Sequence, residues 1–153
     1  MAARLLEAVT AGSGGHGPHS LRVKAVVRET PDAVSLVLDV PPRVRQPFSC
    51  RAGQFVTLRV GLGEQTYLRS YSMSSSPELD RDPQITVKGV DGGVVSNWIN
   101  DHVGEGARLD VDTPSGSFVL DGSDREIISL AAGSGASFMD TVDATLMWNG
   151  VRR

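Results

Sequence analysis

The middle of the chain carries a guanidinium, a phenol ring and two hydroxyls on consecutive residues, Arg69-Ser70-Tyr71-Ser72. This segment is typical of a β-strand, in which neighbouring side chains point to opposite faces. Arg69 and Tyr71 are therefore predicted to share one face, with Ser70 and Ser72 on the other. A guanidinium can hold a phosphate through two parallel hydrogen bonds while an aromatic ring stacks on a planar group. The pair suits a ligand with an anionic and a planar part, although an ordinary exposed strand can carry the same four residues.

A second candidate feature is the glycine pair that precedes a predicted helix. Residues 92–96 read Gly-Gly-Val-Val-Ser, and apolar residues spaced by three and four indicate a helix over 95–103. The first amides of a helix lack helical partners and attract anions, and glycine lets a ligand approach the backbone. A glycine pair alone is also an ordinary turn. With Arg69, however, this helix start would form two sides of a pyrophosphate site, and Tyr71 would offer an aromatic plane for a ring system.

The elements that must position these residues are mainly strands. Apolar runs of strand length recur from residue 21 onward and end in turn residues such as Pro41-Pro42 and Asp91-Gly92-Gly93. The predicted strands span residues 21–28, 34–40, 55–60, 67–73, 85–90 and 107–113. We therefore predict an all-β fold, a six-stranded antiparallel Greek-key barrel with one capping helix.

The pattern changes near residues 121–125. A continuous apolar run over 127–132 leads into Gly133-Ser134-Gly135, which is typical of a strand buried on both faces of a parallel sheet. We expect a flexible glycine-rich leader over 1–20, a barrel domain over 21–123, and the incomplete start of an α/β nucleotide-binding domain over 124–153. Only 18 residues follow Gly135 in this sequence, whereas a single βαβ unit takes ~30.

Four motifs, in this order, resemble the flavin domain of the ferredoxin–NADP reductase superfamily, a barrel of the riboflavin synthase type. They are Arg69-Ser70-Tyr71-Ser72, the Ile-Thr-Val-Lys-Gly-Val of residues 85–90, the Gly-Gly-Val-Val-Ser-Asn-Trp of 92–98 and the Pro-Ser-Gly-Ser-Phe of 114–118. The resemblance extends over residues 21–135. A narrower resemblance, to the reductase components of 3-ketosteroid 9-alpha-hydroxylases and related oxygenases, is carried by Glu29-Thr30, residues 32–40 and Ser96-Asn97-Trp98.

This resemblance implies FAD as the cofactor and a role for each matching residue. Arg69 would bind the FAD pyrophosphate, Tyr71 would stack on the isoalloxazine, and Ser72 would hydrogen-bond near flavin N5, as the one candidate for a catalytic residue. The other implied contacts are Ser70, which helps to fix the strand, the backbone of Val87 and Lys88, the small Gly93 that lets the phosphate come close, the amides of Val94 and Val95, and the hydroxyl of Ser96.

The resemblance also implies an FAD-dependent NAD(P)H oxidoreductase. Family members take a hydride from NADH or NADPH and pass single electrons onward, so the implied partner is a terminal oxygenase or a ferredoxin with an iron–sulfur centre. In such enzymes the cofactor carries the redox chemistry and the protein orients it. Two other interpretations stay open. One is a truncated, non-catalytic flavin-binding fragment, and the other is a β-barrel binding module without flavin.

Composition argues against several other classes of protein. The formal net charge of -3 and the pI near 5.5 give no basic field for nucleic acid. Cys50 is the single cysteine of 153 residues, too few for a disulfide framework, an iron–sulfur cluster or a cysteine zinc site on this chain, and we expect no metal. No apolar run reaches the ~18 residues of a membrane-spanning helix, and no signal peptide is readable. We expect no nucleic-acid or membrane partner and a cytoplasmic location.

Overall fold

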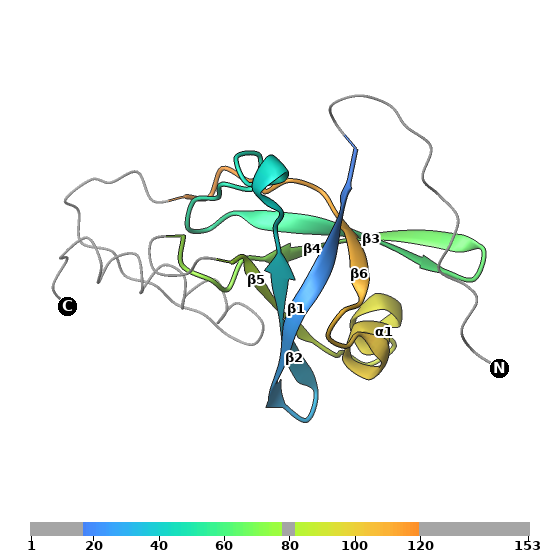
Figure 1. The fold of residues 1–153 in the computed structure, drawn as a ribbon. Helices are drawn as coiled ribbons and strands as arrows, with labels where there is room; N and C mark the ends of the chain where they lie inside the picture. Colours follow the sequence, from blue (N-terminus) through green and yellow to red (C-terminus); the bar gives the residue numbers. More distant parts are fainter. Residues whose placement is uncertain (1–16, 78–81, 120–153) are drawn as a thin grey trace, which may run out of the picture.

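The computed structural model describes residues 17–77 and 82–119, which form six β-strands and one α-helix (Figure 1). The strands are β1 (His19–Thr30), β2 (Ala33–Asp39), β3 (Phe55–Leu62), β4 (Gln65–Ser72), β5 (Gln84–Lys88) and β6 (Arg108–Val111). The helix α1 (Val94–His102) lies between β5 and β6 in the chain, and a short 3-10 helix spans Pro42–Val44. These elements confirm the predicted strands and helix to within two residues at each end. The strand predicted over 127–132 lies outside the described residues.

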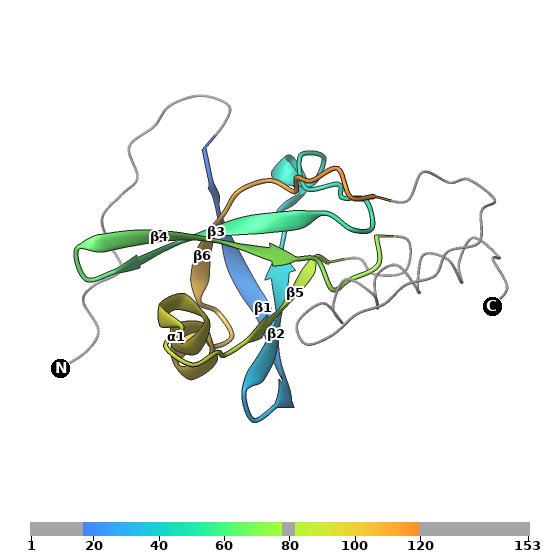
Figure 2. The same ribbon diagram turned by 180° about the vertical axis from the view of Figure 1, so that it is seen from behind.

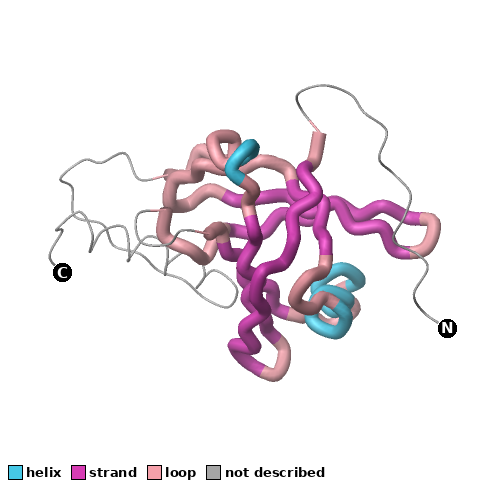
Figure 3. Tube along the Cα trace, viewed as in Figure 1, coloured by secondary structure: helices cyan, strands magenta, loops and turns pink. Residues whose placement is uncertain are grey.

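The six strands belong to one sheet in the order β4-β3-β6-β1-β2-β5, and every neighbouring pair is antiparallel. β6, the last described strand in the chain, pairs with both β1 and β3. Its neighbours in the sheet are therefore strands from the first part of the described chain, not the strand that precedes it in sequence. β1 is 12 residues long and its register with β2 shifts twice. Such shifts bend a strand and increase its twist. The result is the strongly curved sheet seen in Figures 2 and 3.

The two edge strands, β4 and β5, approach each other where β4 ends. Met73 forms an isolated antiparallel bridge with Ile85, and the amide of Ser74 donates to the carbonyl of Gln84 at 2.8 Å. Along most of their length, β4 and β5 are therefore not hydrogen-bonded to each other, and in the part of the chain that the structure describes the sheet closes only at this one bridge. This arrangement confirms the antiparallel barrel-like fold with one helix, and it leaves most of β4 without a second strand neighbour among the described residues.

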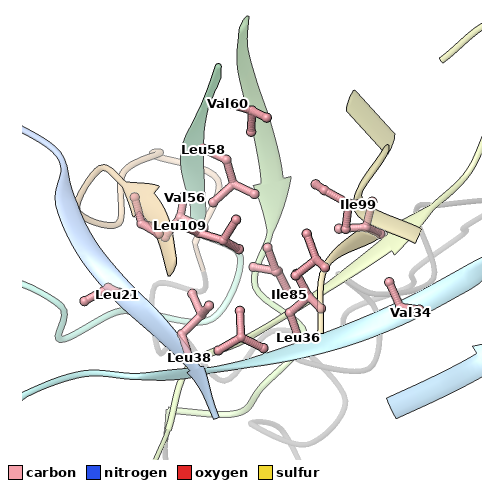
Figure 4. Packing of buried hydrophobic residues seen from close by; sticks show 14 of the residues in the cluster. Leu21, Val34, Leu36, Leu38, Val56, Leu58, Val60, Ile85, Ile99 and Leu109 are labelled. Carbon is pink, nitrogen blue, oxygen red and sulfur yellow. The ribbon is translucent and has the colours of Figure 1, made fainter. Parts of the chain in front are cut away.

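The hydrophobic core fills the inside of the curved sheet and is covered on one side by α1 (Figure 4). Aliphatic side chains come from alternate positions of the strands and from the apolar stripe of the helix. Those at most 4% exposed include Leu21, Val23, Val34, Leu36, Leu38, Val56, Leu58, Val60, Ile85, Val87, Val95, Ile99, Leu109 and Val111. β4 contributes no fully buried side chain. The side chains on its inward face are therefore partly accessible and available for contacts other than core packing.

A chain of hydroxyls joins β2 and β5 to the segment after β4. The hydroxyls of Ser35 and Thr86 lie 2.8 Å apart, and Thr86 donates to the Ser74 hydroxyl at 2.9 Å. Ser35 is 1% exposed, so a buried polar group here depends on this partner. This network of hydroxyls anchors the segment after β4 against β5.

Replacing Thr86 by valine should therefore lower the free energy of unfolding by about 1 kcal/mol, because the shape is kept while Ser35 loses its hydrogen-bond partner. Thr57→Val is the matched control. Thr57 pairs its hydroxyl with Ser70 at 3.0 Å on an exposed face, where water can replace the partner. Urea denaturation of both variants checks the prediction, and equal effects would contradict it.

Candidate functional site

The predicted site residues come from three segments that the fold brings together. β5 contacts both β4 and α1, and the chain runs from β5 directly into α1 through residues 89–93 (Figure 2). The strand carrying Arg69 and Tyr71 and the glycine pair before the helix therefore border the same region of the molecule.

The register of β4 with β3 sets the direction of each β4 side chain. Tyr71 lies opposite Val56 and Arg69 opposite Leu58, and both partners are fully buried. Side chains opposite each other in an antiparallel pair lie on the same face. Arg69 and Tyr71 thus share the inward face, as predicted.

The two serines of the motif lie on the other face of β4. Ser70 lies opposite Thr57, and the two hydroxyls are 3.0 Å apart. Ser72 is exposed and lies opposite Phe55. Ser70 therefore links β4 to β3 through this hydrogen bond.

Arg69 sits at an exposed position and has no anionic partner among residues 17–77 and 82–119. Its Nη1 donates to the carbonyl of Leu68 at 2.8 Å. The guanidinium carbon lies 5.7 Å from the ring centre of Tyr67, within the range of a cation–π contact. An exposed arginine with no carboxylate partner among the described residues is available to bind an external anion.

Tyr71 is half-buried and packs its ring against the core. Burial raises the pKa of its phenol above the usual 10.0, while the positive charge of Arg69 lowers this pKa to a smaller extent. A half-buried aromatic ring that packs against the core is held in place and is suited to stacking.

The raised pKa of Tyr71 predicts a pH dependence. The folded state favours the protonated phenol, so its contribution to stability is complete below pH ~10, the usual tyrosine pKa, and is lost as pH rises through the higher folded-state pKa. Tyrosinate absorbance should show a titration step above pH ~10 that is missing in Tyr71→Phe. If the missing step is centred at or below the usual value, burial of this phenol has no such effect.

The N-terminus of α1 is an uncapped helix start. Gly93 is the N-cap, and no side chain caps the first turn. The amide of Asn97 reaches the Gly93 carbonyl at 3.3 Å, so the amides of Val94, Val95 and Ser96 precede the first helical hydrogen bond and have no helical partner. Uncapped amides together with the helix dipole attract an anion.

The loop before the helix is held in place by its own hydrogen bonds. The amide of Gly93 donates to the Val90 carbonyl at 2.9 Å, and the Asn97 side chain donates to the same carbonyl at 3.0 Å. Gly92 adopts a φ of 69°, a conformation that favours glycine. The three amides are thus presented by a preorganised turn.

The packing of the chain itself requires glycine at position 93, in addition to the expected close approach of a phosphate. A Cβ at this position would lie 2.4 Å from the Ser96 hydroxyl, 2.7 Å from a Val90 methyl and 3.0 Å from the Val90 carbonyl oxygen. The chain itself therefore excludes a side chain here.

The remaining predicted contacts differ in what they can offer. The side chains of Val87 and Val95 are 0% and 1% exposed, so only their backbone groups can face a ligand, and the Val87 carbonyl already accepts from the Asn100 side chain at 3.1 Å. Val94 is exposed. The ammonium of Lys88 lies 3.5 Å from a carboxylate oxygen of Asp32, whose pKa is held below its usual range by the Thr30 hydroxyl and, to a smaller extent, by Lys88.

Two residues at this site were absent from the predicted set. Tyr67 shares the inward face with Arg69, and strand alternation was a sufficient signal to find it. Asn97 holds the loop before α1, and no local pattern indicates that contact, because its partner is a carbonyl seven residues earlier in a turn.

Other features lie away from this site. A hollow of about 160 Å³ is lined by Arg45, Phe48, Cys50, Asp82 and neighbouring residues, and it includes none of the predicted contacts. Within the described ranges, no three metal-binding side chains gather. In that same part of the chain, no helix has the length and apolar character needed to cross a membrane.

Residues 20–120 match the family model described as "Oxidoreductase FAD-binding domain". The ferredoxin reductase component of 3-ketosteroid-9-alpha-monooxygenase from Rhodococcus rhodochrous is 42% identical over 123 residues, covering 78% of this chain and 35% of that protein. The glycine betaine monooxygenase reductase subunit from Pseudomonas aeruginosa is 35% identical over 136 residues, covering 88% and 37%. The chain thus spans about a third of the length of these relatives.

Solved structures of other proteins have a similar fold. The flavohem-like FAD/NAD binding domain of nitric oxide dioxygenase from Vibrio cholerae superposes with a TM-score of 0.74 at 26% identity, covering 88% of this chain and 59% of that one. The ferredoxin reductase in carbazole 1,9a-dioxygenase gives 0.72 at 27% identity, covering 87% and 39%. Because the family model covers residues 20–120, most of the chain, and solved structures share its fold, the chain belongs to the oxidoreductase FAD-binding domain family.

Proposed function

We propose that this chain binds FAD between β4 and the N-terminus of α1. Arg69 holds the pyrophosphate from one side, the amides of Val94, Val95 and Ser96 hold it from the other, and the ring of Tyr71 supports the isoalloxazine. Two groups able to bind an anion border the same region, and this observation carries the proposal. Arg69 has no carboxylate partner among the described residues, and no side chain caps the N-terminus of α1.

The residues present fit this cofactor. A pyrophosphate needs several free hydrogen-bond donors, and the first turn of α1 and the remaining N–H groups of Arg69, whose Nη1 also donates to the Leu68 carbonyl, supply them. The ring system needs an aromatic plane on the same face as the arginine, which Tyr71 supplies through its position two residues along the strand.

Each remaining residue has a supporting role in this proposal. Ser70 braces β4 through Thr57, and Ser72, at the end of the strand, hydrogen-bonds near flavin N5. Val87 and Lys88 present backbone groups to the ribityl chain and ring from β5. Gly93 keeps the phosphate close to the backbone, and Ser96 adds its hydroxyl.

When bound, FAD would supply the redox chemistry: it accepts a hydride from NADH or NADPH and passes single electrons to an acceptor. The chain's own residues would bind and orient it: the ring of Tyr71 would cover one face of the isoalloxazine and keep water from it, and the hydroxyl of Ser72, the last residue of β4, would hydrogen-bond near N5. The names of the relatives, reductase components of monooxygenases, support a terminal oxygenase or ferredoxin as the partner that receives the electrons.

The domain limits follow the same reasoning. We propose a leader over 1–20, the FAD-binding barrel over 21–123 and the start of a nicotinamide-binding domain over 124–153, supported by the family match over 20–120. A reducing, cytoplasmic location is supported by the single cysteine among 153 residues.

Visible absorption of the purified chain tests cofactor binding. The expected result is a yellow protein that releases FAD on denaturation, or a colourless one that takes up FAD on titration. Protein that stays colourless in excess FAD would reject the proposal and favour the flavin-free binding module.

Mixing the FAD-loaded chain with NADH or NADPH in a stopped-flow instrument then tests turnover. Rapid bleaching of the flavin supports a reductase that works as this chain. Retained FAD without bleaching supports the alternative of a flavin-binding fragment that needs the rest of a longer protein.

A further inference from the structure

Alternate residues of β4 form a connected row on its inward face. Gln65, Tyr67 and Arg69 lie opposite Leu62, Val60 and Leu58 of β3. The row begins beside the turn that joins β3 to β4 and continues through Arg69, the arginine assigned to the pyrophosphate, to Tyr71. The β3–β4 turn lies at the far end of this hairpin from β5 (Figure 2).

Tyr67 is held at both ends of its side chain. Its hydroxyl donates to Oε1 of Gln65, and its half-buried ring packs against the hydrophobic core. A ring fixed in this way offers a stable face to whatever lies over it.

The guanidinium of Arg69 lies over that ring, 5.7 Å from its centre. Arg69 is exposed, and an exposed arginine side chain has many rotamers, most of which point away from any one ligand. The cation–π contact and the hydrogen bond from Nη1 to the Leu68 carbonyl limit this freedom. Neither contact neutralises the positive charge.

We propose that Tyr67 is a positioning residue that holds the Arg69 guanidinium on the inward face of β4, ready for the cofactor's phosphate. It acts through Arg69 and does not itself touch the cofactor. This inference rests on the proposed FAD site, because it assigns a partner to the arginine of that site.

The test compares three single variants of the whole chain by fluorescence titration with FAD and with FMN. Tyr67→Leu removes the aromatic face and should raise both dissociation constants about two- to fivefold, because both ligands carry a phosphate. Tyr67→Phe keeps the aromatic face and loses only the hydrogen bond to Gln65, so it should keep most of the affinity for both ligands. Leu68→Ala, on the opposite face and 50% exposed, is the matched control and should also leave binding unchanged.

A double-mutant cycle separates positioning from a general structural effect. In an Arg69→Met background, Tyr67→Leu should have no further effect on FAD affinity, since the group that Tyr67 positions is gone. Additive losses in the cycle would overturn the proposal, and so would a loss in Tyr67→Phe as large as in Tyr67→Leu.

A loss of affinity for FAD with FMN unchanged would also overturn it, because that result would place Tyr67 against the adenine. Failure of the proposed function has a different signature. In that case the unmodified chain binds neither ligand, or Arg69→Met binds FAD as well as the unmodified chain does.

Discussion

Arg69→Ala is expected to weaken FAD binding by about 10- to 100-fold, the loss that follows removal of a hydrogen-bonding partner to a charged group. The guanidinium is the side-chain cation on the inward face of β4, and no carboxylate of the described residues neutralises it. Fluorescence or visible titration with FAD measures the change. Thermal unfolding without FAD should be nearly unchanged, because Arg69 is exposed.

Two companion variants make this prediction specific. Arg69→Lys keeps the charge but loses the planar fork, so it should recover only part of the affinity. Arg59→Ala removes an arginine from the neighbouring strand. Arg59 lies opposite Leu68 on the outer face, paired with Asp112 at 3.3 Å, and should not affect FAD. Equal losses in Arg59→Ala and Arg69→Ala would show a general charge effect and contradict the assigned role.

Gly93→Ala is expected to damage both the loop and the cofactor site. The added Cβ would lie 2.4 Å from the Ser96 hydroxyl and 3.0 Å from the Val90 carbonyl oxygen, and the second of these is backbone that cannot rotate away. Overpacking of this kind lowers the free energy of unfolding by about 1–3 kcal/mol. Any shift of the loop also moves the amides of Val94 and Val95, so FAD affinity should fall about tenfold or more, which corresponds to ~1.4 kcal/mol.

Gly104→Ala is the matched control for this substitution. A Cβ at Gly104 would meet nothing within 4 Å, and its backbone carries no φ that disfavours a side chain. Urea denaturation and FAD titration of both variants provide the comparison. If Gly93→Ala binds FAD with unchanged affinity, the first turn of α1 does not hold the pyrophosphate.

Much of the fold was predictable because alternation and helical spacing are local signals. Val34, Leu36, Leu38 and Val40 take every second position, and β2 (Ala33–Asp39) indeed buries Val34, Leu36 and Leu38 in the core. The stripe that predicted the helix buries Val95 and Ile99. β5 ends two residues earlier than predicted, at Lys88, which lies opposite Ala33, the first residue of its partner strand β2.

The site was predictable to the extent that it depends on strand alternation. The common face of Arg69 and Tyr71 follows from their spacing, and the register with β3 confirms it. The roles given to the predicted FAD contacts remain predictions, which the experiments above are designed to test.

Other features depend on contacts between residues far apart in the chain. A periodic pattern states which face of a strand is buried but not which strand will lie beside it. The order β4-β3-β6-β1-β2-β5 and the bridge from Met73 to Ile85 arise from packing of the whole core, and they bring the end of β4 to β5.

Side-chain contacts within the site also could not be predicted from local sequence. The packing of Ser96 and Val90 around Gly93 and the stacking of Arg69 on Tyr67 depend on the path of a turn and on rotamers. Residue type and spacing leave both of these free. Local sequence was thus sufficient to identify the strands, the helix and the face that carries the chemistry. The folded structure was needed to show how that face meets the helix and which neighbours hold its residues in place, because these contacts form only when the core is assembled.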